Sequence, residues 1–295
     1  MEKLPNLIIA GVHKAATTSL YTYLSWHPDV YGSGKKEIHY FTPLRFGSEV
    51  KPISEYEKYF QKRKDEKYAI DASPSYVYGG ETIIRQMQTL LPPHRVIVVL
   101  RNPVDRFISN YNYLKAKLLI DVNEDLSTFI KKCAIEAEKP LVDDDYSRAI
   151  MEGRYIDFIP EWIDTYGENF KILYFEELVS NPAEVMVELA RWLDISEDEF
   201  KNFEYTVENK TIRVKSKSLH ALALFINHNL EVFFRNNHKL KVMLRSVYYG
   251  LNKKSKDKEN LNKANIDFIE SLYKESNDKL SQYLKARDLK LPNWL

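Results

Sequence analysis

The stretch Leu7-Ile8-Ile9-Ala10-Gly11-Val12-His13-Lys14-Ala15-Ala16-Thr17-Thr18-Ser19-Leu20 decides the fold of this chain. Its apolar beginning, Leu7 to Ala10, is typical of a buried parallel strand. Gly11 then begins a tight turn, and hydroxyl residues follow where a helix should start. A strand that turns into a helix directs backbone N–H groups and the positive end of the helix dipole at one point. Lys14 adds a full positive charge there. The stretch therefore predicts a phosphate-binding loop.

Composition and charge exclude several classes of protein. The chain has 295 residues, and its 43 Lys and Arg against 42 Asp and Glu leave a net charge of +1. Without a basic field we expect no nucleic-acid partner. The single cysteine, Cys133, excludes an internal disulfide and a cysteine-rich metal site. No apolar run approaches the roughly 18 residues of a transmembrane segment, and the first strand follows Met1 too closely for a signal peptide. These features predict a cytoplasmic protein.

Strands and helices alternate along the chain. Apolar runs at 7–10, 96–100 and 171–175, with shorter extended segments at 29–31 and from residue 68, are separated by amphipathic stretches such as 151–166. This alternation predicts an α/β fold: a single P-loop-like domain over 1–295, with a central parallel sheet flanked by helices. The sheet core covers about 5–205, and the C-terminal part, about 218–295, is helical. Within it, apolar and basic residues alternate over 219–251. This pattern favours a helix pair packed on the core; the alternatives are peripheral membrane contact, a cover over the acceptor cleft and a homodimer interface.

A second polar loop follows the segment at 29–31. It contains Lys36, Glu37 and His39 between glycines and aromatic residues. Open α/β sheets bind ligands at the carboxyl edge of their strands. We therefore expect this loop to lie near Lys14.

The strand at 96–100 ends in Arg101, where a P-loop kinase needs a carboxylate for Mg²⁺. A cation in that place indicates a nucleotide held by Arg and Lys without a divalent ion. Ser109 lies on nearly the same face of the following helix, and an Arg and a Ser that face one way fit a second phosphate. Two separate phosphate sites on one nucleotide indicate a 3′,5′-bisphosphate rather than a triphosphate.

With these motifs the chain resembles a sulfotransferase that uses 3′-phosphoadenosine 5′-phosphosulfate (PAPS), closest to the glycosaminoglycan (heparan sulfate) type. Residues 13–19 are similar to the family's 5′-phosphosulfate loop, and Arg101-Asn102-Pro103 with Arg106 and Ser109 resembles its 3′-phosphate motif. Lys36-Glu37-Ile38-His39-Tyr40-Phe41 is similar to the Lys-Glu-x-His-Phe-Phe segment of glycan-type members, and Gly153-Arg154-Tyr155 also fits. The resemblance covers nearly the whole chain.

The resemblance implies PAPS as cofactor, 3′-phosphoadenosine 5′-phosphate (PAP) as product, and no metal. It assigns cofactor binding to His13, Lys14, Ala15, Ala16, Thr17, Thr18, Ser19, Arg101 and Ser109. Ala15 and Ala16 stand where the family usually has Gly, which restricts positive φ. Because one cysteine cannot form the family's disulfide-supported cofactor loop, we expect the basic loop at 209–217, with Arg213, near the adenosine 3′-phosphate.

Catalysis of sulfuryl transfer needs positioning and cations. We expect Glu37 to act as the general base in an in-line attack. Lys14 stabilises the departing phosphate, and Lys36 either neutralises the sulfonate or holds Glu37. His39 is the alternative base, although a residue held in place by hydrogen bonds is its favoured role. The residues predicted on the acceptor side are Asp71, Ser73, Tyr76, Arg154 and Tyr155.

The acceptor predicted from the resemblance is a hydroxyl of a carbohydrate or glycoconjugate, such as a glycan or glycolipid. The abundant aromatic residues suit a small hydroxylated lipid, sterol or polyketide equally well. A P-loop kinase and a non-catalytic glycan-binding protein are the remaining alternatives.

Overall fold

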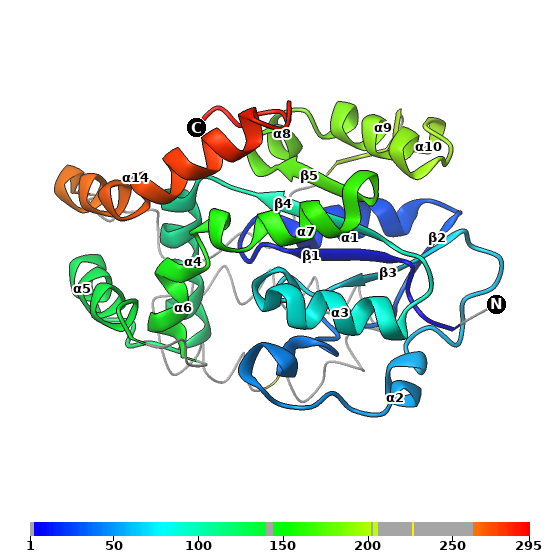
Figure 1. Cartoon of the computed structure of the whole chain (residues 1–295), viewed down its shortest axis with the longest axis horizontal. Helices are drawn as coiled ribbons and strands as arrows, with labels where there is room; N and C mark the ends of the chain where they lie inside the picture. Colours follow the sequence, from blue (N-terminus) through cyan, green and yellow to red (C-terminus); the bar gives the residue numbers. More distant parts are fainter. Residues whose placement is uncertain (1–2, 140–143, 202, 206–225, 227–261) are drawn as a thin grey trace.

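The computed structural model describes residues 3–139, 144–201, 203–205, 226 and 262–295. In this part of the chain a five-stranded sheet lies between layers of helices (Figure 1). Its strands are β1 (Leu7–Gly11), β2 (Val30–Gly32), β3 (Tyr68–Ala72), β4 (Arg95–Leu100) and β5 (Phe170–Tyr174). Their order is β2-β3-β1-β4-β5, and every neighbouring pair is parallel. The predicted α/β fold with a central parallel sheet is confirmed.

The position of β1 in the middle of the sheet explains why its sequence is apolar throughout. Leu7 pairs with Ile70 of β3 on one side and with Arg95 of β4 on the other. All of β1 is buried, because helices cover both faces of the sheet and leave no face to solvent.

Two connections between parallel strands run toward opposite ends of the sheet, and they locate the edge where a ligand is expected. Helix α1 (Thr17–Trp26) joins β1 to β2, and α3 (Gly80–Leu90) joins β3 to β4 in the other direction across the sheet. Right-handed crossovers then place α1 on one face and α3, with α7 (Ile159–Tyr166), on the other, as Figure 1 shows. The direction of the connections changes between β1 and β4, and open α/β sheets bind ligands at such a point.

A second core lies beside the sheet. Helices α4 (Pro103–Lys117), α5 (Leu126–Glu136) and α6 (Asp145–Met151) pack with the first half of α14 (Lys263–Lys285) around Phe107, Phe129 and Tyr273. Further along α14, Leu280 and Leu284 join the main core. The helix α14 therefore ties the two cores together. The remaining helices are α2 (Ile53–Glu57), α8 (Phe175–Ser180), α9 (Pro182–Leu193) and α10 (Asp198–Lys201), with 3-10 helices η1 (Thr42–Phe46), η2 (Tyr76–Gly79), η3 (Tyr155–Asp157) and η4 (Gly167–Asn169).

The helix predicted over 151–166 is wrong in its extent. The chain leaves α6 at Met151, passes through η3 and begins α7 at Ile159. Gly153 lies at the break, where an added Cβ would stand 2.6 Å from the Tyr273 ring. The contact with α14 therefore requires glycine at this point, and Pro160 starts the next helix.

Two predictions fall outside the described residues. Arg213 is one, and the segment 219–251, apart from residue 226, is the other. The assignment of 1–295 to a single domain stays a prediction. Among the described residues, no helix combines the length and apolar character that spanning a bilayer requires.

Candidate active site

Lys14 and Arg101 meet at the edge between β1 and β4. Nη1 of Arg101 donates to the backbone oxygen of Lys14 at 2.9 Å. The Arg101 guanidinium lies 4.1 Å above the centre of the Phe175 ring, and the Lys14 ammonium lies 4.1 Å from the centre of the Tyr113 ring. Burial, followed by repulsion from Arg101, lowers the pKa of Lys14 to about 8. Two cations held this close favour an anionic ligand.

Unsatisfied donors point to the same kind of ligand. Nε of Arg101 is buried and has no hydrogen-bond partner among the described residues. The first intrahelical bond of α1 runs from the Leu20 N–H to the Ala16 oxygen, so the N–H groups of the turn before it belong to the helix N-terminus. A buried guanidinium donor, an ammonium and a helix N-terminus are each suited to bind a phosphate or sulfate group.

The backbone is strained on both sides of this edge. Lys14 (φ 68°), Ala16 (59°), Glu37 (59°) and His39 (58°) all adopt the left-handed conformation. Each such residue costs on the order of 1–2 kcal/mol when it is not glycine. Strain of this kind persists only where the surrounding structure enforces it, and it concentrates at functional sites.

The start of α1 differs from the predicted hydroxyl cap. Its N-cap residue is Ala16, and no side chain caps the helix. Thr17 and Ser19 are buried instead, and Ala15 is buried beside them. The turn therefore reaches the left-handed conformation with alanine where glycine was expected.

Glu37 projects from the loop after β2 and is tied to β3. Its N–H donates to the Ala72 oxygen at 3.1 Å. Nζ of Lys36 contacts Oε1 of Glu37, and Nε2 of His39 lies 3.7 Å from Oε2. Burial alone would raise the pKa of Glu37, but hydrogen bonding to His39 and the charge of Lys36 outweigh it and hold this pKa well below its usual range. Glu37 is therefore ionised, and Lys36 holds it.

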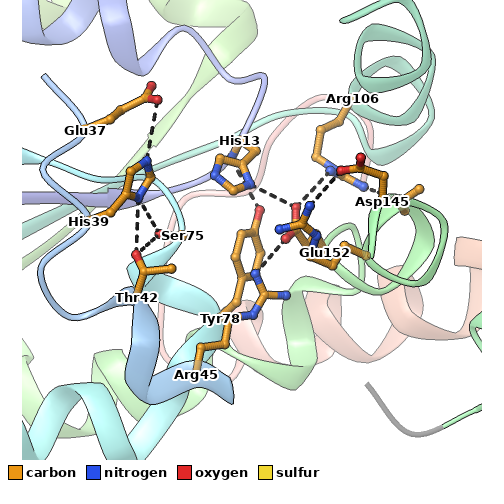
Figure 2. Close-up of polar contacts among 12 residues, drawn as sticks. His13, Glu37, His39, Thr42, Arg45, Ser75, Tyr78, Arg106, Asp145 and Glu152 are labelled. Carbon is orange, nitrogen blue, oxygen red and sulfur yellow. Dashed lines mark hydrogen bonds and ion pairs between the residues drawn. The ribbon is translucent and has the colours of Figure 1, made fainter. Parts of the chain in front are cut away.

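The His39 ring is held by hydroxyl groups. Its Nδ1 lies 3.2 Å from Oγ1 of Thr42 and 3.1 Å from Oγ of Ser75 (Figure 2). The backbone N–H of His39 donates to Oγ of Ser73 at 3.0 Å. These contacts leave Nε2 facing Glu37.

Three of the residues predicted on the acceptor side are completely buried: Asp71, Ser73 and Tyr76. Oγ of Ser73 donates to Asp71 Oδ1 at 2.8 Å, and the hydroxyls of Tyr76 and Tyr56 donate to Oδ2 at 2.7 and 2.6 Å. Because these side chains have no exposed surface, they do not line an acceptor cleft here. Through Ser73 they support the loop of His39 instead.

Of the remaining predicted residues, Tyr155 contacts Arg101. The hydroxyl of Tyr155 donates to the Arg101 oxygen at 2.7 Å and is buried, so Tyr155 supports the arginine. Arg154 precedes it at the start of η3 and is half-buried. Ser109 is half-buried in α4, one turn beyond the buried Arg106. Thr18 lies in the first turn of α1.

The structure adds a cluster around Glu152 that sequence reasoning missed. Nδ1 of His13 lies 3.0 Å from Oε2 of Glu152, and Nη1 of Arg45 lies 2.7 Å from Oε1. His13 and Glu152 are 139 positions apart, and no local pattern marks that pairing.

Tyr113 was missed too, since an aromatic residue in a helix is usually part of the core. Among the described residues, no group of three or more His, Cys, Asp or Glu is arranged to hold a metal.

The fold and the site define a P-loop-like α/β protein with an anion-binding edge. Lys14 and Arg101 form that edge, and the Lys36–Glu37–His39 group lies close enough for Glu37 and Lys36 to influence the pKa of Lys14. The site therefore places a carboxylate beside two cations.

Comparison with known proteins gives the family. The model of the sulfotransferase domain matches residues 4–240, so the chain belongs to the sulfotransferase domain family. The bifunctional heparan sulfate N-deacetylase/N-sulfotransferase 1 of Caenorhabditis briggsae is 24% identical over 303 residues, covering 100% of this chain and 32% of that protein. Human heparan sulfate glucosamine 3-O-sulfotransferase 3B1 is 30% identical over 183 residues, covering 62% and 44%. The resemblance stated from the motifs is confirmed.

A solved structure supports the fold. A sulfotransferase from Alicyclobacillus acidocaldarius matches with a TM-score of 0.58 and 24% identity, covering 79% of this chain and 96% of that one. The chain spans only about a third of the length of the first curated relative.

Proposed function

We propose that this chain transfers a sulfuryl group from PAPS to a hydroxyl of a carbohydrate or glycoconjugate. The observation that carries the proposal is the contact between Arg101 and Lys14 at the end of β1, with Glu37 beside them. This arrangement offers two cations to a phosphorylated donor and one carboxylate to an acceptor hydroxyl.

The residues present fit the cofactor. The buried, unpartnered Nε of Arg101 supports an anionic ligand at this edge. Lys14 and the first turn of α1 would hold the 5′ end, and Arg101 with Ser109 the 3′-phosphate. Arg213 belongs to the same proposal. PAPS supplies an activated sulfuryl group on a phosphate leaving group.

Glu37 is the proposed general base. It would take the proton of the acceptor hydroxyl, while the Lys14 ammonium stabilises negative charge on the leaving side. A carboxylate with so low a pKa is a weak base, and the contacts with His39 and Lys36 are what lower it. Loss of the Lys36 contact would raise the pKa of Glu37 and strengthen the base. We propose that a bound anionic donor attracts Lys36 away from Glu37. The binding of the donor would then raise the pKa of Glu37 and make it a stronger base.

The proposed acceptor class follows from the curated relatives, whose names specify heparan sulfate. A small hydroxylated lipid, sterol or polyketide is the alternative. A cytoplasmic location and a homodimer are parts of the proposal that rest on the sequence alone.

Transfer of label from [³⁵S]PAPS tests the function. The chain is incubated with completely desulfated heparin, with a glycolipid and with a sterol, and the ³⁵S in each product is counted. We expect label in the saccharide and its loss in Glu37→Gln, but not in the control Glu81→Gln, whose side chain pairs with Arg85 on the surface. A kinase would instead consume ATP–Mg²⁺, and a glycan-binding protein would retain the saccharide without labelling it.

A further inference from the structure

The Glu152 carboxylate contacts basic side chains from three separate segments. His13 comes from the loop after β1, Arg45 from η1 and Arg106 from α4 (Figure 2). Their nitrogen atoms lie 3.0, 2.7 and 3.8 Å from the Glu152 oxygens. The side chain of Glu152 is only 5% exposed. One buried carboxylate therefore joins the predicted phosphosulfate loop to the segment after the Glu37 loop and to the helix that follows Arg101.

This carboxylate acts only as an acceptor. Burial alone would raise its pKa, but the neighbouring His13, Arg45 and Arg106 outweigh burial and hold the pKa of Glu152 well below its usual range. An ionised carboxylate has no proton to donate. The hydrogen bond at 3.0 Å must therefore be donated by Nδ1–H of His13, since the bond made by one ring nitrogen decides which nitrogen carries the proton.

The other side of the His13 ring faces the site. Figure 2 shows His13 between the Glu152 cluster and the Glu37–His39 pair. The ring is 29% exposed and lies close enough to Glu37 for the two side chains to interact electrostatically. Lys14 is the next residue in the chain. With Nδ1 bound to Glu152, Nε2 is the ring nitrogen available to a ligand of this loop.

We propose that Glu152 is a positioning residue of the transfer reaction: it holds Nδ1–H of His13 and thereby directs Nε2 to the phosphate–sulfonate group bound at Lys14. The proposal rests on the proposed function. A ring between the Glu152 carboxylate and an anionic ligand carries both protons, so Nε2–H donates to the ligand.

Nitrogen NMR of the full chain labelled with [¹⁵N]histidine tests the pairing directly. The His13 signals are assigned by their loss in His13→Asn. We expect Nδ1 to be protonated in the unliganded wild type and both ring nitrogens to be protonated after addition of PAP. In Glu152→Gln we expect loss of the fixed Nδ1–H form and a smaller response of Nε2 to PAP. Glu124→Gln is the matched control, because Glu124 is 6% exposed and pairs with Lys132 away from the site.

Label transfer from [³⁵S]PAPS to the acceptor found above then links the pairing to turnover. We expect Glu152→Gln and His13→Asn each to lower kcat/KM about tenfold, and the double variant to be no slower than His13→Asn alone. Multiplied losses in the double variant would overturn the proposal, as would an unchanged His13 spectrum in Glu152→Gln.

A folding defect in Glu152→Gln does not remove the test. His13→Asn keeps an amide donor for Glu152 and leaves both arginine pairs intact, so wild-type transfer by this variant would also overturn the proposal. If the wild type does not bind PAP in calorimetry, the proposed function fails. The spectra of unliganded wild type and Glu152→Gln still decide whether Glu152 fixes the ring.

Discussion

Raising the pH should weaken PAP binding through Lys14. Burial and the charge of Arg101 lower the pKa of Lys14 to about 8, so the unliganded protein loses its ammonium as the pH rises through that value. Only the ammonium form of Lys14 binds the anion, and the bound phosphate in turn keeps the Lys14 side chain protonated. The dissociation constant of PAP should therefore rise about tenfold between pH 7 and pH 9, since one pKa unit corresponds to about 1.36 kcal/mol. Most of the change, about fivefold, should occur between pH 8 and pH 9.

Isothermal titration calorimetry with PAP at constant ionic strength measures this change. The phosphates of PAP contribute little, because their second pKa lies near about 6. Lys14→Arg is the matched control, since its guanidinium stays charged throughout this range. Its dissociation constant should be constant from pH 7 to pH 9, even if binding is weaker. The reasoning is refuted if wild-type binding does not depend on pH, or if Lys14→Arg loses affinity equally.

Three further predictions concern single residues. Glu37→Gln should lower kcat by about 10² or more while the dissociation constant of PAP is unchanged, because general-base catalysis contributes about that much. If Glu37→Gln is active and His39→Ala is inactive, the general base is His39. Arg101→Ala should weaken binding of PAP far more than of AMP in calorimetry, because only PAP carries the 3′-phosphate, and equal losses would contradict that assignment. Ala16→Gly should stabilise the fold by about 0.5–1 kcal/mol in denaturant unfolding, because relief of left-handed strain exceeds the added freedom of the unfolded chain; a destabilised variant would show that the turn bears no such strain.

The sheet could be predicted because its signals are local. The runs that became β1 and β4 are continuous and apolar, as strands buried on both faces must be. Lys14, in the turn after β1, and Arg101, directly after β4, could be placed at one edge because parallel strands end together. The end of a helix is harder to predict. The expected helix is broken at Gly153, and the close contact that requires glycine there is with Tyr273, far along the chain.

The site was predictable only where its residues follow a strand. Glu37 and Lys36 could be placed near Lys14 for that reason. Asp71 was predicted on the acceptor side, whereas its carboxylate accepts hydrogen bonds from tyrosine hydroxyls and is buried. The pairing of His13 with Glu152 depends on tertiary structure alone, and one sequence does not contain it.

The central claim is that Lys14 and Arg101 hold the two ends of one bisphosphorylated adenosine. The most direct test compares the dissociation constants of PAP, 5′-AMP and 3′-AMP for the wild-type chain in one calorimetric series. Because each phosphate should contribute its own charge-assisted hydrogen bonds, of about 1.5–3 kcal/mol each, we expect PAP to bind at least about tenfold more tightly than either monophosphate. Equal affinity for all three, or no binding of PAP, would contradict the account.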